Sequence, residues 1–318
     1  MAVGDILREF IAPAEAQGNG RAIAFDGTNL YLTVEGKAEI YKVTTTGTFL
    51  QTIPTTINYG ALQYDSKENV LWAGNYTGNF EIYKIDLNGN VLFSFNYQSY
   101  VDPADPFPDY VDGVTVDQAT DTLYFSTDAG FTVYNVTKTG QFISKFSTPP
   151  SGSAQNGANS GLASDSDDLW LAFVLLFGSD KEIVQTDLSG NVLARFPTTN
   201  YNAEDIEYDP ITFAPKCVLW SNEATGSRNR IRAWEITCGS EPCPFDDLIT
   251  AIANQEAGLA SLTQIEVNKL NKLLSLVNDI DNLNKVNDSI ERFLKLLIKK
   301  EIILELLLGE ALEGKSQC

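Results

Sequence analysis

The chain contains no histidine among its 318 residues. This absence excludes Ser-His-Asp and Cys-His catalysis, histidine-ligated metals and imidazole acid–base chemistry. An enzyme built from this sequence would have to use carboxylates, tyrosine or lysine. Enzymatic activity therefore stays open, and the sequence favours a non-catalytic role.

Basic residues and long apolar runs are also scarce. Lysine and arginine number 22 against 42 acidic residues, which gives a formal net charge of −20. A field of that sign repels phosphate backbones, so nucleic acid is not an expected partner. The longest apolar candidate, Ile302–Leu308, is too short to cross a bilayer and contains Glu305, so no membrane span is expected. The start lacks the pattern of a secretory signal, so synthesis in the cytosol is expected if Met1 is the native start.

Only four cysteines are present: Cys217, Cys238, Cys243 and Cys318. Without histidine, and at these spacings, they make a poor zinc site. The better interpretation is a disulfide near the end of the repeat region, either Cys217–Cys238 or Cys238–Cys243. Cys318 would then be a free thiol or an intermolecular link. Such bonds indicate an oxidising final location.

What the sequence does contain is repetition. A strand-like phrase with glycine at its second position occurs five times. The copies are Val3–Phe10, Thr46–Ile53, Asn88–Phe95, Thr139–Phe146 and Ser189–Phe196. Glycine supplies the positive φ that a tight turn before each strand requires.

A second phrase consists of a short apolar strand ending in aspartate, a turn, and leucine followed by tyrosine or tryptophan. Its aspartates, at positions 26, 65, 117, 165 and 209, are 39, 52, 48 and 44 residues apart. A third strand rich in valine, isoleucine and tyrosine completes each unit. Several short strands repeating at about 40–50 residues indicate a β-propeller. We expect each aspartate to accept backbone N–H bonds in its turn, and the aromatic residues to pack between blades.

The fifth unit has three strands and leaves the pattern at Thr237. Its missing outer strand is the phrase at residues 3–10, which is expected to pair into the last blade and close the ring. The predicted fold is an all-β propeller of five blades over residues 1–240, followed by an α-helical domain. The repeat resembles the loose propeller family of NHL, YVTN and gluconolactonase-like proteins, and this resemblance implies architecture only.

Propeller ligands usually lie at the mouth of the central channel, where the innermost strands begin. The candidate residues at that mouth are Arg21, Tyr59, Tyr110, Asp112, Asn159, Glu204 and Asp205. The three carboxylates suit a hard cation such as calcium. No other cofactor is implied, and the metal is otherwise unassigned. The same carboxylates suit a glycan hydrolase or lyase, although no spacing motif marks a catalytic residue. A solvated rim without a ligand is the third interpretation.

A glycan-binding, lectin-like propeller is a further alternative. Loops at residues 75–79 and 95–102 are rich in aromatic, asparagine and aspartate residues, which suit sugars. These loops differ from blade to blade, whereas a lectin propeller tends to repeat its site.

Residues 245–318 form a second, helical domain in this interpretation. Apolar residues recur there at steps of three and four, which indicates a coiled coil or bundle. Two helices are predicted, from about Asp246 to Leu276 and from a capping box at Asp288–Glu291 to about Leu312. The apolar face of the second is too wide for one partner, so we expect homo-oligomerisation through residues 245–312.

The helical region also resembles a module of spore-forming Firmicutes proteins. The resemblance rests on Leu248–Ala260, Val286–Ile290 and Lys299–Glu301. It implies a structural or interaction protein on a bacterial spore or cell surface, with cytoplasmic location as the alternative. The propeller would be displayed on a helical oligomerisation stalk and would bind a glycan or a surface protein, with avidity from the oligomer.

Overall fold

The computed structural model describes residues 3–148, 157–175, 181–224, 228–238, 267–269, 271–272 and 280–315. Its contacts divide the chain into two units, Met1–Gly239 and Ser240–Cys318, and each unit is described by itself.

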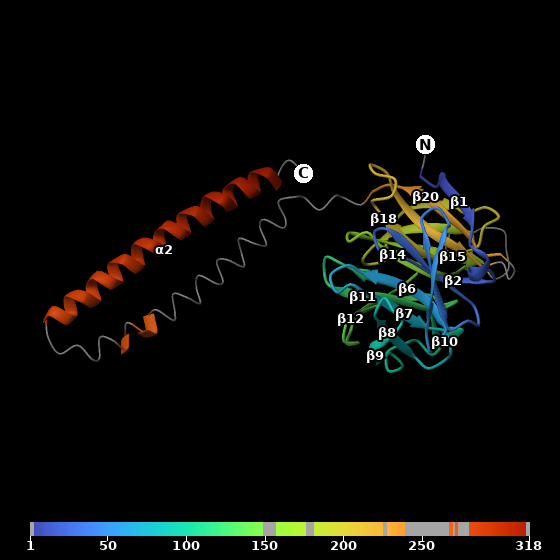
Figure 1. The fold of residues 1–318 in the computed structure, drawn as a ribbon, viewed down its shortest axis with the longest axis horizontal. Helices are drawn as coiled ribbons and strands as arrows, with labels where there is room; N and C mark the ends of the chain where they lie inside the picture. Colours follow the sequence, from blue (N-terminus) through green and yellow to red (C-terminus); the bar gives the residue numbers. More distant parts are fainter. Residues whose placement is uncertain are drawn as a thin grey trace. The chain divides into compact units, whose positions relative to one another are not determined.

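The first unit is a β-propeller of five four-stranded antiparallel sheets (Figure 1), which confirms the predicted fold. The inner strands β2, β6, β10, β14 and β18 form a closed ring, in which each contacts two neighbours. From the inner to the outer strand, blade 1 contains β2 (Gly20–Phe25), β3 (Asn29–Val34), β4 (Glu39–Thr44) and β5 (Phe49–Pro54), and blade 2 contains β6 (Tyr59–Asp65), β7 (Val70–Asn75), β8 (Glu81–Ile85) and β9 (Val91–Asn96). Blade 3 contains β10 (Phe107–Asp117), β11 (Thr122–Asp128), β12 (Thr132–Thr137) and β13 (Phe142–Ser147), and blade 4 contains β14 (Gly157–Ser164), β15 (Asp168–Leu175), β16 (Glu182–Asp187) and β17 (Val192–Pro197).

Blade 5 joins the two ends of the propeller chain. It contains β18 (Ala203–Asp209), β19 (Cys217–Glu223) and β20 (Arg230–Ile236), and its outer strand is β1 (Ile6–Ile11). β1 pairs antiparallel with β20, from Ile6 opposite Trp234 to Ile11 opposite Arg230. A one-turn 3₁₀ helix, η1 (Ala14–Ala16), then leads into blade 1. The N-terminal strand therefore closes the ring as the repeat predicts.

The apolar core is divided among the joints between blades. Five clusters of buried residues each combine side chains of two adjacent blades. The joint between blades 5 and 1, for example, includes Trp220 and Ile231 from blade 5 and Leu32 from blade 1. Because each blade contributes one face to each of two joints, the inner and middle strands are buried on both sides.

The repeated glycine has a second role besides its positive φ. Gly190 has a φ of +88°, and a Cβ built on it would lie 2.3 Å from the Phe146 ring of the preceding blade. The same relation joins Gly47 to Phe10 and Gly140 to Phe95. The glycine at the start of one outer phrase thus accommodates the apolar residue at the end of the previous one.

The repeated aspartates hold the turns after the inner strands. Asp209 accepts hydrogen bonds from the backbone N–H groups of Ile211 and Thr212 at 2.7 and 2.9 Å, as predicted. Its other oxygen accepts a 2.7 Å bond from the buried indole Nε1 of Trp220. Trp72 and Trp170 make the corresponding bonds to the aspartates of their own blades. The aromatic residue of the phrase therefore anchors the aspartate besides filling the joint.

A disulfide between Cys217 and Cys238 links the start of β19 to the residues that follow β20. This is one of the two pairings that the sequence allows, and it excludes Cys238–Cys243. Cys243 and Cys318 lie outside the described residues.

The described helix of the second unit, α2 (Ile280–Lys315), is 36 residues long. The predicted start at Asp288 is wrong, because the helix runs unbroken through the asparagine-rich segment and through Gly309. The weak helix preference of asparagine and aspartate is outweighed by an apolar pattern that continues across it. Glu291 pairs with Lys295 at 2.6 Å, one turn on, instead of serving a capping box. Most of the predicted first helix lies outside the described residues.

Large apolar side chains of α2 face solvent in this single chain. Leu294, Ile298, Ile302, Ile303 and Leu306 are 46–64% exposed. Among the described residues, no helix combines the length and the apolar character that crossing a bilayer requires.

Candidate functional site

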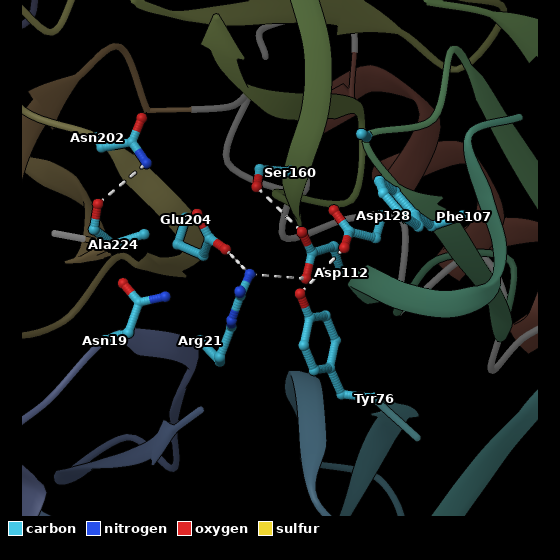
Figure 2. Close-up of a pocket in the computed structure, with 11 residues that line it drawn as sticks. Asn19, Arg21, Tyr76, Phe107, Asp112, Asp128, Ser160, Asn202, Glu204 and Ala224 are labelled. Carbon is cyan, nitrogen blue, oxygen red and sulfur yellow. Dashed lines mark hydrogen bonds and ion pairs between the residues drawn. The ribbon is translucent and has the colours of Figure 1, made fainter. Parts of the chain in front are cut away.

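A polar cavity of about 300 Å³ opens where the inner strands begin, which is the predicted channel mouth. All five blades contribute to it. Its lining consists of Asn19, Arg21, Tyr76, Phe107, Asp112, Asp128, Ala129, Ser160, Asn202, Glu204 and Ala224 (Figure 2).

Arg21 is the charged centre of this cavity. Its Nη1 hydrogen-bonds the carboxylate of Glu204 and lies 3.8 Å from Oδ1 of Asp112. Its Nη2 lies 3.2 Å from Glu35, and its guanidinium carbon stands 4.3 Å above the centre of the Tyr76 ring. Arg21 therefore joins blade 1 to blades 2, 3 and 5 through one side chain.

A pair of carboxyl groups lies beside the arginine. Asp128 lies beside Asp112, and repulsion between the two negative charges raises the pKa of Asp112. Tyr76 donates a 3.0 Å bond to Asp128 Oδ2, and Ser160 donates a 3.2 Å bond to Asp112 Oδ2 (Figure 2). The pair is thus oriented by one hydroxyl on each side.

Burial controls the protonation of these groups. It raises the pKa of Asp112 well above its ordinary value, with further increases from Asp128 and Glu204 and an opposing effect of Arg21. Burial likewise raises the pKa of Glu204 to about 7 despite the neighbouring guanidinium. Burial and the two aspartates raise the pKa of Tyr76, so its phenol remains a donor. The cavity consequently holds exchangeable protons near neutral pH.

This arrangement suits proton transfer and the binding of hydroxyl groups more than cation binding. Asp112, whose pKa is raised by burial, and Glu204, whose pKa is about 7, are carboxyl groups of the kind that general acid–base chemistry uses. The guanidinium already supplies a positive charge among the three acids. The described residues include no group of three acidic or cysteine side chains placed to hold a metal ion. Calcium binding stays a prediction.

The structure brings three of the seven predicted mouth residues into the cavity: Arg21, Asp112 and Glu204. Tyr59 instead lies buried in the joint between blades 1 and 2, edge-on to Tyr83. Tyr110 packs against Tyr76, with ring centres 5.1 Å apart, but does not line the cavity.

Two further predicted residues are buried beside the mouth. Asn159 is fully buried, and neither polar atom of its side chain has a hydrogen-bond partner among the described residues. Asp205 accepts a 3.1 Å bond from the backbone N–H of Ile23, which ties β18 to β2. Because side chains of a strand alternate in direction, Glu204 enters the cavity and Asp205 does not.

Sequence reasoning missed Asp128, and it included Tyr76 only within the loop at residues 75–79 suggested for glycan binding, not at the channel mouth. Tyr76 directly follows β7 and Asp128 ends β11, and these second strands return to the mouth from which the inner strands leave. Antiparallel pairing was the available signal, because it brings the end of each second strand beside the start of the first.

The loops suggested for glycan binding contain residues with structural roles. Asn75 is fully buried and donates a 3.2 Å bond to the carbonyl of Asp109. Tyr97 is also fully buried, against Phe125 at the joint between blades 2 and 3.

Fold and cavity together define the class of the first unit: a five-bladed β-propeller with a polar channel mouth. The second unit has a more specific similarity: residues 241–315 match the family of the alpha-helical endospore appendage domain. No curated protein matches the chain in sequence.

Solved structures similar to the propeller share little sequence with it. An uncharacterised protein from Bacteroides thetaiotaomicron is 13% identical, with a TM-score of 0.46 over 73% of each chain. The PQQ-bound aldose sugar dehydrogenase of Streptomyces coelicolor is 13% identical, with a TM-score of 0.43 over 73% of this chain and 97% of that one. Streptogramin B lyase is 16% identical, with a TM-score of 0.39 over 67% of this chain and 65% of that one.

Proposed function

We propose that this chain is a structural component of bacterial endospore appendages, in which helical regions of several chains associate and display propellers at the spore surface. The observation that carries the proposal is the match of residues 241–315 to the endospore appendage domain. The propeller would supply the interaction surface, for a surface protein or a glycan.

The exposed face of α2 supports the association of helical regions. The distribution of Ile298, Ile302, Ile303 and Leu307 around the helix is wider than one neighbouring helix covers, and all four are at least 37% exposed. Apolar area of this kind is normally buried against other chains. The occupant we infer is therefore the same helix of further copies.

The molar mass of the purified full-length chain, measured by light scattering, tests the association. We expect a multiple of 34.9 kDa for the full chain and a single propeller mass for residues 1–239. Ile298→Glu with Leu306→Glu should dissociate the oligomer. The matched control is Lys299→Glu with Lys300→Glu, which adds acid at exposed positions of the same segment without removing apolar surface. A monomeric full-length chain would refute association.

Immunogold electron microscopy of spores tests the location separately. Antibody against the propeller should label appendages on intact spores of the source bacterium, and spores lacking the gene provide the control. Label confined to the spore interior would contradict the proposal even if the chain is oligomeric.

A second candidate function rests on the three carboxyl groups at the channel mouth. Asp112 and Asp128, with Glu204 beside them, form the kind of carboxyl set that hydrolyses or eliminates at glycosidic bonds. Turnover of a glycan library by the wild type and by Asp112→Asn and Glu204→Gln variants tests this. Activity unchanged by both substitutions would remove these residues from the chemistry.

A further inference from the structure

The opposite end of the central channel contains a second cavity, of about 400 Å³. It lies where the inner strands end, and again every blade contributes to it. Its walls combine Phe25, Val116, Pro210 and Ile211 with a polar rim, and no lysine or arginine is among its lining residues. A cavity of this size accommodates a small organic molecule.

Glu207 of β18 supplies a buried acid to this cavity. Its side chain is 3% exposed, and its Oε1 accepts a 2.9 Å hydrogen bond from Gln63 Nε2. The orientation of that amide is set by Thr115, which donates a 2.8 Å bond to Gln63 Oε1. Because the amide nitrogen of Gln63 faces Glu207, Oε1 of Glu207 acts as a hydrogen-bond acceptor. Oε2 has no hydrogen-bond partner among the described residues.

Most of the charged groups around Glu207 are acids. Asp205 and Asp209 lie on the same strand, whereas Asp26, which follows β2, lines the cavity and pairs with Lys42 at 3.1 Å. The aspartates at or just after the ends of β6, β10 and β14 accept hydrogen bonds within their own blades, and Asp65 also pairs with Lys138 of blade 3 at 2.6 Å. Burial, together with Asp209, raises the pKa of Glu207 well above its ordinary value, against opposing effects of Gln63 and of the backbone N–H groups of Phe25 and Tyr208. An anionic ligand would be repelled here, whereas a cation with an apolar body meets both the acids and the walls.

We propose that this cavity binds a compact organic amine, with the ammonium group on Glu207 and the alkyl part against Phe25, Val116 and Ile211. Binding exchanges one proton: the Glu207 carboxylic acid releases its proton to the solvent and its carboxylate pairs with the incoming ammonium. This site is separate from the channel-mouth cavity at Arg21 and does not depend on the role of the helical unit.

Titration calorimetry of the full chain with n-butylammonium tests the proposal, with n-butanol as the neutral probe of the same shape. Repeating the titration in two buffers of different ionisation enthalpy should show the release of about one proton per amine bound. Over the range in which Glu207 is protonated, the amine affinity should rise about tenfold per pH unit. Equal affinity for butanol, or amine binding without proton release, would overturn the proposal.

Variants locate the site. Glu207→Gln should lower the affinity for butylammonium at least about tenfold and abolish proton release, while Glu15→Gln, at an exposed acid outside both cavities, should leave both unchanged. Ile211 is 59% exposed, so Ile211→Trp should fold normally and weaken binding by filling the cavity. If Glu207→Gln fails to fold, the wild-type pH series and Ile211→Trp still decide the question. Unchanged binding in Ile211→Trp and the absence of a pH dependence would refute the site.

Discussion

Nε of Arg232 donates a 2.5 Å hydrogen bond to the carboxylate of Glu9, although 223 residues separate the two in sequence. This bond lies beside the β1–β20 ladder and marks the seam at which the propeller closes. The seam also includes Phe10, which packs edge-on to Trp220 with ring centres 6.3 Å apart.

Deleting residues 1–11 should therefore open the ring. The variant loses the β1 ladder and the packing of Leu7 and Phe10 on the joint between blades 5 and 1. We expect a loss of at least about 3 kcal/mol in the free energy of unfolding, measured with urea. Deleting residues 240–318 is the control and should leave the propeller transition in place. A monodisperse propeller of unchanged stability without its first strand would show that blade 5 is closed in another way.

Gly190→Ala should lower the free energy of unfolding by more than the backbone strain at a positive φ alone. Gly190 and Gly36 both have positive φ, +88° and +74°, but a Cβ meets Phe146 at 2.3 Å in the first case and nothing within 4 Å in the second. Strain of about 1–2 kcal/mol is expected for both substitutions, and overpacking adds about 1–3 kcal/mol at Gly190 only. Equal losses in thermal or chemical denaturation would mean that the ring contact is unimportant.

Trp220→Phe should destabilise the propeller by about 1–3 kcal/mol, because Asp209 loses a buried donor and the smaller ring leaves space. Asp209 retains two backbone donors, so the turn should persist. Trp170→Phe removes the equivalent 3.0 Å bond in blade 4 and should behave alike. Urea denaturation of both variants checks this, and wild-type stability in both would contradict an anchoring role for the indole.

Stability should fall as the pH rises through the range in which Glu204 titrates. Its pKa is about 7 in the folded protein against an ordinary 4.5, so the native state keeps a proton that the unfolded chain releases earlier. The resulting stabilisation is present in full below about pH 4.5 and is lost by about pH 7, with an upper limit of about 3 kcal/mol.

Urea denaturation across pH 4–8 measures this slope in the wild type and in Glu204→Gln, where it should flatten. Glu35→Gln is a control of opposite sign, because the hydrogen bond from Asn19 lowers the pKa of Glu35. The stabilisation that Glu35 contributes is present above its ordinary pKa and disappears as the pH falls below that value. Identical slopes in the wild type and Glu204→Gln would argue against a proton on Glu204.

Breaking the Cys217–Cys238 disulfide should destabilise blade 5. The bond closes a segment with a sequence separation of 21 residues, for which the chain-entropy relation gives about 3 kcal/mol. Denaturation with and without a reducing agent, beside Cys217→Ser, measures the loss. Cys243→Ser is the control, since Cys238 already has Cys217 as its partner.

The sequence predicts most of the propeller because every blade repeats the same short sequence phrases. Glycine phrases and aspartate turns recur in register, so the blade count and the closing strand follow from spacing alone. The side-chain directions at the channel mouth do not follow in the same way. Glu204 and Asp205 are adjacent and chemically alike, and only the phase of β18 decides which one reaches the cavity.

The start of α2 does not follow from the local sequence. Asp288 and Glu291 have the spacing of a cap, yet both lie inside α2. A capping motif predicts a helix start only where no apolar pattern continues through it, and here that pattern begins before Asp288.

The contact between Gly190 and Phe146 has a consequence for how the ring can be cut. Each outer phrase has a glycine near its start and an apolar residue near its end. The glycine of one blade contacts the apolar residue of the preceding blade, so neighbouring blades meet through two different surfaces, as subunits in the heterologous interfaces of a cyclic oligomer do. In such an assembly the five joints between blades are equivalent, so the ring can close whichever joint contains the chain ends. A circular permutant that links blade 5 to β1 and opens between blades 2 and 3 would close through the pairing of Gly140 with Phe95, the same joint in another place.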